Sequence, residues 1–100
     1  MKHALSSLEF RSIYPKAKSL IIGDLLFRYR KTDCPKIGFI VSRKYGNAYH
    51  RALFKRRCRS LFEKYRSLGS CWTIILRPNK TKITFSDVEN SFKVFYENLK

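Results

Sequence analysis

Acidic side chains are scarce in this sequence: seven Asp and Glu stand against 22 Lys and Arg, which gives a formal net charge of +15 at pH 7. The carboxylates are scattered and form no D-x-D grouping of the kind that holds catalytic metal ions. The two histidines, His3 and His50, lie far apart and have no companion motif for general acid–base chemistry. The sequence therefore predicts no catalytic residues and no metal site in the protein itself.

Cysteine is also sparse, and its spacing is uninformative. Cys34, Cys58 and Cys71 are odd in number and lack C-x-x-C spacing, so we expect neither a disulfide framework nor a zinc site. No apolar run approaches the roughly 20 residues that span a bilayer, and no lipidation motif is present. The first residues lack an apolar stretch of signal-peptide length, so the expected location is the cytoplasm.

The sequence does contain enough apolar residues for one packed core, since 44% of its residues are hydrophobic and 15% aromatic. We expect a single domain over residues 1–100. So basic a domain repels itself unless a polyanion is bound, and nucleic acid is the commonest such partner. An anionic membrane surface is the main rival, and it is disfavoured because no spanning or anchoring segment is found. No small-molecule substrate is expected.

The first half of the chain predicts a short helix followed by strands. Ser6 and Glu9 fit a capping box, and the helix is expected to end at Tyr14 because Pro15 disfavours the α conformation in the residue before it. Strand-like runs follow at 19–22, 25–29 and 36–41, separated by turn residues. Three consecutive strands with short connections favour an antiparallel meander.

The second half predicts two long helices around one strand. A helix from about 48 to 66 carries an apolar stripe, a fourth strand covers 71–76, and a last helix begins near Thr84, capped by its hydroxyl. The stripe consists of Phe54, Cys58, Leu61, Phe62 and Tyr65, and the buried face of the last helix consists of Phe85, Val88, Phe92, Phe95 and Leu99. The order αβββαβα indicates an α+β fold, a two-layer α/β sandwich on one four-stranded sheet.

Basic residues concentrate between positions 43 and 66, where nine of them face a single acid, Glu63. On the helix they line both flanks of the apolar stripe: Arg51, Lys55 and Arg59 on one side, His50, Arg57 and Lys64 on the other. A solvated helix face is the alternative, but such faces usually mix both signs to gain i,i+4 pairs. The pattern favours phosphate binding. Insertion into a DNA major groove is disfavoured because the preceding segment is a strand and no helix-turn-helix pair is seen.

One stretch is similar to a family signature. Residues 41–48, Val-Ser-Arg-Lys-Tyr-Gly-Asn-Ala, followed by Arg51, Lys55, Arg56 and Arg59, resemble the motif of the ribonuclease P protein component. The order of the other elements agrees with that family over nearly the whole chain. The resemblance implies an α/β sandwich with a left-handed βαβ crossover, like the second domain of a small-subunit ribosomal protein.

The resemblance also implies a function. Members of this family bind the catalytic RNA of ribonuclease P and the 5′ leader of precursor tRNA, and so assist endonucleolytic removal of the leader. Hydrolysis is then performed by Mg²⁺ and RNA groups, and the protein alone binds no cofactor. The implied RNA-contacting residues are Arg43, Lys44, Asn47, Arg51, Lys55, Arg56 and Arg59, and the implied leader cleft contains Phe10, Tyr14 and Arg28 or Tyr29.

Aromatic faces that stack bases beside a positively charged groove are the usual means of holding a single strand, which agrees with this cleft. The alternative for Phe10 and Tyr14 is that they anchor the first helix as core residues. A ribosomal or other structural RNA-binding protein would fit the charge and fold class equally well, and only the signature and the cleft argue against it.

The sequence departs from the family motif at one place. Where relatives usually have Arg-Asn-Arg, this chain has Arg51-Ala52-Leu53, so one amide and one guanidinium are missing. Arg57 lies one helical turn after Leu53, and a long side chain on a helix leans toward the N-terminus. Arg57 is therefore a candidate to place its charge near the position that Leu53 leaves empty.

Overall fold

The computed structural model describes residues 3–99. Its helices are α1 (Ser7–Ile13), α2 (Ala48–Ser67) and α3 (Phe85–Asn98), and its strands are β1 (Lys18–Ile22), β2 (Leu25–Lys31), β3 (Ile37–Phe39) and β4 (Trp72–Pro78). Short 3-10 turns at Tyr14–Lys16 and Arg43–Tyr45 precede β1 and α2. The mixed α/β class, the single four-stranded sheet and the element order agree with the prediction.

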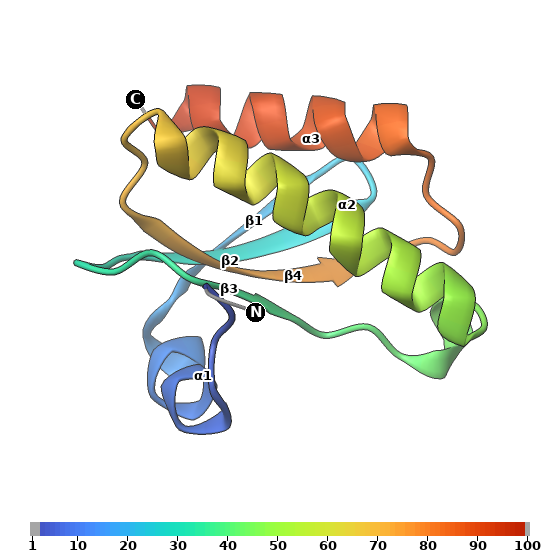
Figure 1. Ribbon diagram of the computed structural model, residues 1–100, viewed down its shortest axis with the longest axis horizontal. Helices are drawn as coiled ribbons and strands as arrows, with labels where there is room; N and C mark the ends of the chain where they lie inside the picture. The colour runs from blue at the N-terminus through green and yellow to red at the C-terminus, as the bar shows by residue number, and fades with distance from the viewer. Residues whose placement is uncertain (1–2, 100) are drawn as a thin grey trace.

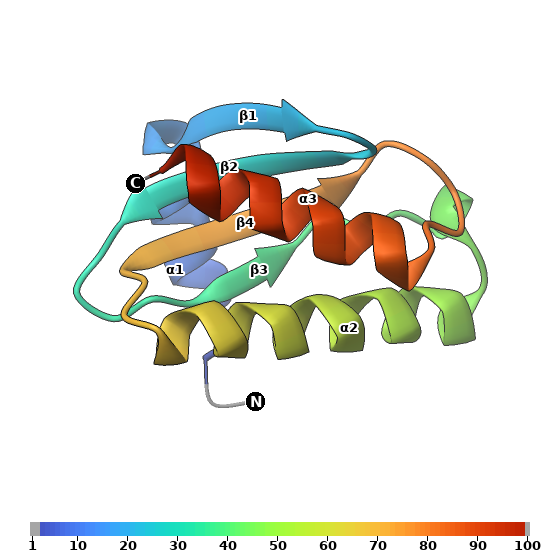
Figure 2. The same ribbon diagram turned by 90° about the horizontal axis from the view of Figure 1, so that it is seen from above.

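The sheet has the strand order β1-β2-β4-β3, and α2 and α3 cover one of its faces while α1 lies on the other (Figures 1 and 2). β1 pairs with β2 and β2 with β4 in antiparallel fashion, whereas β3 pairs with β4 in parallel. The predicted three-strand meander is therefore wrong at its third strand. β3 leaves the hairpin and becomes the partner of β4, to which α2 connects it as a parallel βαβ unit.

The core lies between the sheet and the two long helices. Phe27 is fully buried, stacks on Phe95 of α3 with ring centroids 4.2 Å apart, and meets Phe92 edge-on at 5.5 Å. Four residues of the predicted stripe on α2 are buried, namely Phe54, Cys58, Leu61 and Phe62. The fifth, Tyr65, is half-buried, and its ring stacks on Tyr96. Burial raises the pKa of the Cys58 thiol, so this cysteine serves as a small core residue.

The helix termini follow local sequence rules. The Ser6 hydroxyl accepts a hydrogen bond from Glu9 N and the Glu9 carboxylate accepts one from Ser6 N, which confirms the predicted capping box. Thr84 caps α3 by accepting from Asp87 N. The predicted end of the first helix, Tyr14, lies one residue beyond the observed end of α1 at Ile13. Tyr14 has αR dihedrals because it begins a 3-10 turn that includes Pro15.

The buried face of α3 differs from the prediction at both ends. Phe85 is 41% exposed and Leu99 only half-buried, while Ser91 and Tyr96 are buried. The chain before α1 also joins the sheet: Ile37 N donates to His3 O, and Leu5 N donates to Ile37 O, both at 2.9 Å. Residues 3–5 therefore run beside β3, on the side away from β4.

Candidate RNA-binding surface

The basic side chains of α2 are positioned by its apolar stripe. Because Phe54, Cys58 and Leu61 must face the core, the residues between them are directed to the flanks and the outer surface. Asn47 begins the helix, and its side-chain oxygen accepts from His50 N at 2.9 Å. The predicted RNA contacts Arg51, Lys55, Arg57 and Arg59 are half-buried along their stems, while Arg43, Lys44, Asn47 and Arg56 are exposed.

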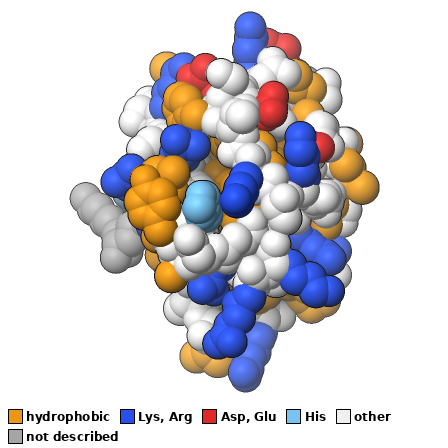
Figure 3. All heavy atoms as spheres, turned by 90° about the vertical axis from the view of Figure 1, so that its right-hand side faces the viewer, with side chains coloured by type: hydrophobic (Ala, Val, Ile, Leu, Met, Phe, Trp, Pro, Cys, Tyr) orange, Lys and Arg blue, Asp and Glu red, His pale blue; other side chains and the backbone are white. Residues whose placement is uncertain are grey.

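The Lys and Arg side chains of α2 form no ion pairs with carboxylates among residues 3–99. Among residues 3–99 the ion pairs are His3 with Glu63, Lys36 with Glu9, and Lys80 with Asp24. None of them includes a Lys or Arg of α2, and the one acid of that helix accepts a hydrogen bond from His3 Nδ1. At the end of the molecule where α2 begins, Lys and Arg side chains spread across the surface and the acids lie in the upper part of the view (Figure 3). The surface is built to meet an anion.

Arg57 lies on the flank of α2 that faces α3. Its guanidinium stands over the ring of Phe85 at 5.6 Å from the centroid. Arg57 and Leu53 line the same small hollow of about 170 Å³, together with His50 and Lys82. The structure therefore places Arg57 beside Leu53.

On the opposite face of the sheet, Phe10, Tyr14 and Arg28 form one continuous stack. The rings of Phe10 and Tyr14 are 5.5 Å apart and nearly parallel, and the Arg28 guanidinium lies 4.0 Å from the Tyr14 centroid. Arg28 also donates to the carbonyl of Tyr14 at 2.6 Å and to that of Ala17 at 3.4 Å. Three of the four predicted cleft residues are thus brought together, and Arg28 fastens the end of α1 to β2.

Tyr29, the fourth predicted cleft residue, is not part of this stack. Neighbouring residues of a strand point to opposite faces, so Tyr29 lies on the side that α3 covers. There it meets Trp72 and Phe95 edge-on, with centroids 5.5 and 5.3 Å away. Of the two alternatives that the sequence left open, only Arg28 therefore lies on the same face of the sheet as Phe10 and Tyr14, whereas Tyr29 lies on the opposite face.

Two features hold α1 close to the sheet. A Cβ atom on Gly38 would come within 2.9 Å of the Leu5 side chain and 3.3 Å of the Phe10 ring, so glycine at this position leaves room for both side chains to pack against the sheet. The Lys36 amino group donates to the Glu9 carboxylate at 2.6 Å. This bond, followed by the bonds from Ser6, lowers the pKa of Glu9 from 4.5 to about 2.

The depressed pKa of Glu9 predicts acid-sensitive docking of α1. A carboxyl group whose pKa is lowered on folding contributes stability that is present above its unfolded pKa and is lost as the pH falls. Between about pH 4.5 and 2, the amide protection factors of α1 should therefore fall before those of β2 and β4. Glu9→Gln should show low α1 protection factors already at neutral pH and little further change in them on acidification. Identical exchange profiles for the two proteins would contradict this role for Glu9.

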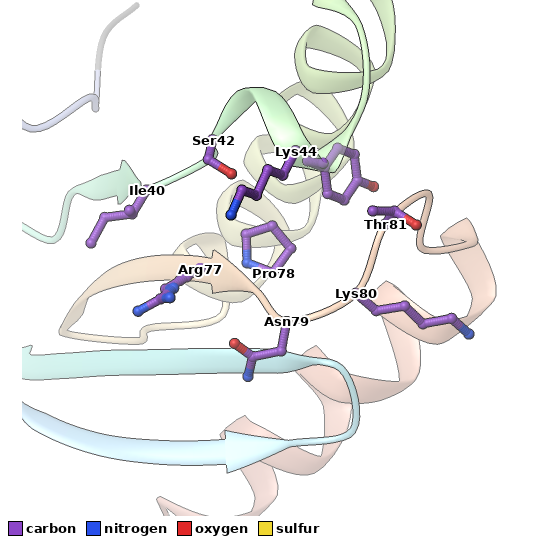
Figure 4. A pocket seen from close by; sticks show the side chains of 9 residues that line it. Ile40, Ser42, Lys44, Arg77, Pro78, Asn79, Lys80 and Thr81 are labelled. Atoms are coloured by element: carbon purple, nitrogen blue, oxygen red, sulfur yellow. The ribbon is translucent and has the colours of Figure 1, made fainter.

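A basic hollow of about 430 Å³ lies where the parallel strands β3 and β4 end (Figure 4). Lys44 reaches over Pro78 from the turn before α2, and Arg77 and Asn79 come from the end of β4. Tyr45 secures this turn, because its hydroxyl accepts from Ile83 N at 3.1 Å. Lys44 was predicted from the sequence as a site residue, whereas Arg77, Asn79 and Lys80 were not. The sequence does contain a cluster of basic residues here, Arg77, Lys80 and Lys82. Its position beside Lys44 follows only from the pairing of β4 with β3.

The described residues contain no group of three or more His, Cys, Asp or Glu side chains placed to hold a metal ion. None of the helices within 3–99 is long and apolar enough to cross a membrane.

A cationic helix without carboxylate partners among residues 3–99, a basic hollow and an aromatic stack beside the sheet are features expected of the polyanion-binding class of proteins. Comparison with known sequences identifies the family: the chain matches the family model of Ribonuclease P over residues 2–100. The chain therefore belongs to the ribonuclease P protein family.

Curated relatives and solved structures agree with that membership. The chain is 39% identical over 64 residues to the ribonuclease P protein component of Chlamydia caviae, and this alignment covers 63% of the chain and 46% of the relative. It thus matches about half the length of that chlamydial protein. To the component of Mycoplasma mobile it is 26% identical over 93 residues, which cover 91% of the chain and 83% of the relative.

The fold is also that of solved ribonuclease P proteins. The Staphylococcus aureus RNase P protein superimposes with a TM-score of 0.81 at 25% identity, covering 96% of this chain and 93% of that one. The Thermotoga maritima protein gives a TM-score of 0.79 at 22% identity, with 97% of each chain covered.

Proposed function

We propose that this protein is the accessory subunit of ribonuclease P, that it binds the catalytic RNA through α2, and that it holds the 5′ leader of precursor tRNA against the sheet. The observation that carries the proposal is the absence of any carboxylate partner for the basic side chains of α2 within residues 3–99. The ribosomal or structural alternative is not favoured, because the chain matches the Ribonuclease P family over 2–100.

In this proposal the two faces of the molecule bind different RNAs: the face with α2 binds the catalytic RNA, and the face with α1 binds the leader. Arg51, Lys55 and Arg59 contact the backbone of the catalytic RNA, as does Arg43 in the turn before α2. Lys44 extends this contact to the hollow at the end of β3 and β4. The stack of Phe10 and Tyr14 offers an aromatic surface to leader bases, beside the charge of Arg28. The RNA subunit, with its Mg²⁺, removes the leader in the cytoplasm, and the protein raises the affinity for the precursor.

Reconstitution tests the proposal directly. The protein, combined with a bacterial catalytic RNA at low Mg²⁺, should restore removal of the leader, and rigorously RNA-free protein should cleave nothing. A double variant, Lys55→Ala with Arg59→Ala, should lose most of this restoration. The matched control removes the same charge from the other flank and from α3, through Lys64→Ala with Lys93→Ala. Metal-dependent cleavage by the protein alone would overturn the proposal.

A swap between positions 53 and 57 tests whether Arg57 replaces the missing motif guanidinium. Arg57→Ala should weaken binding to the catalytic RNA by about 1–3 kcal/mol, the usual cost of removing a charge-assisted bond. Adding Leu53→Arg to that variant should restore much of the affinity, because both positions line the same hollow. Lys64→Ala, on the same flank, is the control. If Arg57→Ala and Lys64→Ala weaken RNA binding equally, the hypothesis that Arg57 supplies the guanidinium missing at position 53 is disproved.

A further inference from the structure

Tyr49, in the first turn of α2, is the most exposed aromatic residue of the described chain. Its side chain is 68% exposed, whereas Phe85 is 41% exposed and the other aromatic side chains of residues 3–99 are buried or half-buried. An exposed tyrosine alone is ordinary. This one stands on a helix whose Lys and Arg side chains have no carboxylate partners within 3–99, so an anionic partner that reaches the helix also reaches the ring.

The ring of Tyr49 is braced by the helix cap. The His50 imidazole packs against it edge-on, with centroids 5.5 Å apart and an interplanar angle of 82°. His50 is in turn fixed by Asn47, whose side-chain oxygen accepts from His50 N at 2.9 Å and from His50 Nδ1 at 2.8 Å. A tyrosine has only two side-chain torsions, so it loses little conformational entropy when a flat partner stacks on it.

The surroundings of the ring are open on one side and cationic on the other. Side chains on a helix lean toward the N-terminus, so residue 52 would cover the ring of Tyr49 if it were long. It is alanine, and it is exposed. Arg56 lies two turns further on the same outer side of the helix, and Arg43 is exposed in the turn before it. A base stacked on Tyr49 would thus have a cation near the phosphate on either side.

We propose that Tyr49 is a stacking platform for an unpaired base of the RNA that α2 binds. The proposal rests on the proposed function, and it extends it by naming what this helix recognises: a single-stranded or looped-out nucleotide. Because Ala52 has a short side chain, it leaves the ring of Tyr49 uncovered. Every base has a flat face, so the platform tolerates different sequences but requires that the base be unpaired.

The test compares a short single-stranded RNA that carries a fluorescent adenine analogue with a blunt duplex RNA of the same length. Tyr49→Ala should lower affinity for the single strand by about 5- to 150-fold, the range measured for base stacking on aromatic residues. Tyr49→Phe should bind like the wild type. Affinity for the duplex should be unchanged in both variants. The analogue should be quenched on binding to the wild type and to Tyr49→Phe, but not on binding to Tyr49→Ala.

Two control variants separate stacking from general effects. Leu68→Ala removes another exposed apolar side chain, 75% exposed at the far end of α2, and should change nothing. Arg56→Ala should reduce the slope of log affinity against log salt by about 1, because it removes a phosphate contact, whereas Tyr49→Ala should leave the slope unchanged. Because Tyr49 is exposed, thermal unfolding of its variants should match the wild type.

The outcomes distinguish the platform from the function on which it rests. If Tyr49→Ala binds the single strand as well as Leu68→Ala does, or loses single strand and duplex equally, the platform is overturned. In that case leader removal by the reconstituted wild type still supports the proposed function. If the wild type fails to restore leader removal yet quenches the analogue through Tyr49, the proposed function fails and the platform holds.

Discussion

Affinity for the catalytic RNA should fall by about a thousandfold when the salt concentration rises from roughly 50 to 200 mM, as expected when at least six phosphates are neutralised. Each neutralised phosphate releases condensed counterions, so log affinity should decline linearly with log salt. The basic candidates for these interactions are Arg43, Lys44, Arg51, Lys55, Arg56, Arg57 and Arg59. None of them is neutralised by a carboxylate within residues 3–99, so their charges are available to RNA.

Fluorescence anisotropy of labelled RNA across a salt series would measure this slope. The Lys55→Ala and Arg59→Ala double variant should flatten the slope by about 2, one unit for each phosphate that the variant leaves without its cation. Lys93→Ala, which removes an exposed charge from α3, should leave it unchanged. A nearly flat line for the wild type would contradict backbone binding by α2.

Phe27→Ala should be the most damaging single substitution for the fold, with a loss of about 3–5 kcal/mol in the free energy of unfolding. The ring is fully buried and contacts both Phe92 and Phe95 of α3, so its removal leaves a cavity in the core and abolishes both aromatic contacts. Small domains are stable by only about 5–15 kcal/mol, and the net charge of +15 adds self-repulsion. The variant should be partly unfolded in low-salt buffer.

Urea denaturation followed by circular dichroism would quantify the loss. Phe85→Ala makes the same truncation at a position that is 41% exposed, and it should cost much less because part of the ring is already in water. Equal midpoints for Phe27→Ala and the wild type would show that the aromatic stack is not what holds α3 on the sheet.

Local signals in the sequence were sufficient for the elements but not for their pairing. The capping box at Ser6 and Glu9 and the cap at Thr84 depend on residues only three positions apart, and the structure contains both. The partner of β3 depends on a strand more than thirty residues away, and the preference for neighbouring strands gave the wrong answer. The hollow near Arg77 and Lys44 was missed for the same reason.

The placement of Tyr29 away from Phe10 and Tyr14 could not be predicted for a different physical reason. Side chains alternate between the two faces of a strand, so a shift of one residue moves a side chain from the cleft into the core. Arg28 and Tyr29 both suit an RNA cleft chemically, and composition could not choose between them. The choice is made by tertiary packing: Trp72 and Phe95 enclose the tyrosine, and carbonyl oxygens at the end of α1 accept from the arginine.

The pairing of residues 3–5 with β3 has a consequence for how the protein behaves at high concentration. β3 ends the sheet, and an uncovered edge strand offers free N–H and C=O groups on which another chain can add a strand. Here His3 and Leu5 occupy the backbone groups of Ile37. Residues 3–5 thus cover the outer edge of β3 and should reduce edge-to-edge aggregation. A preparation shortened to begin at Ser6 would expose a β-edge and self-associate more readily than the longer chain, even though its core is intact.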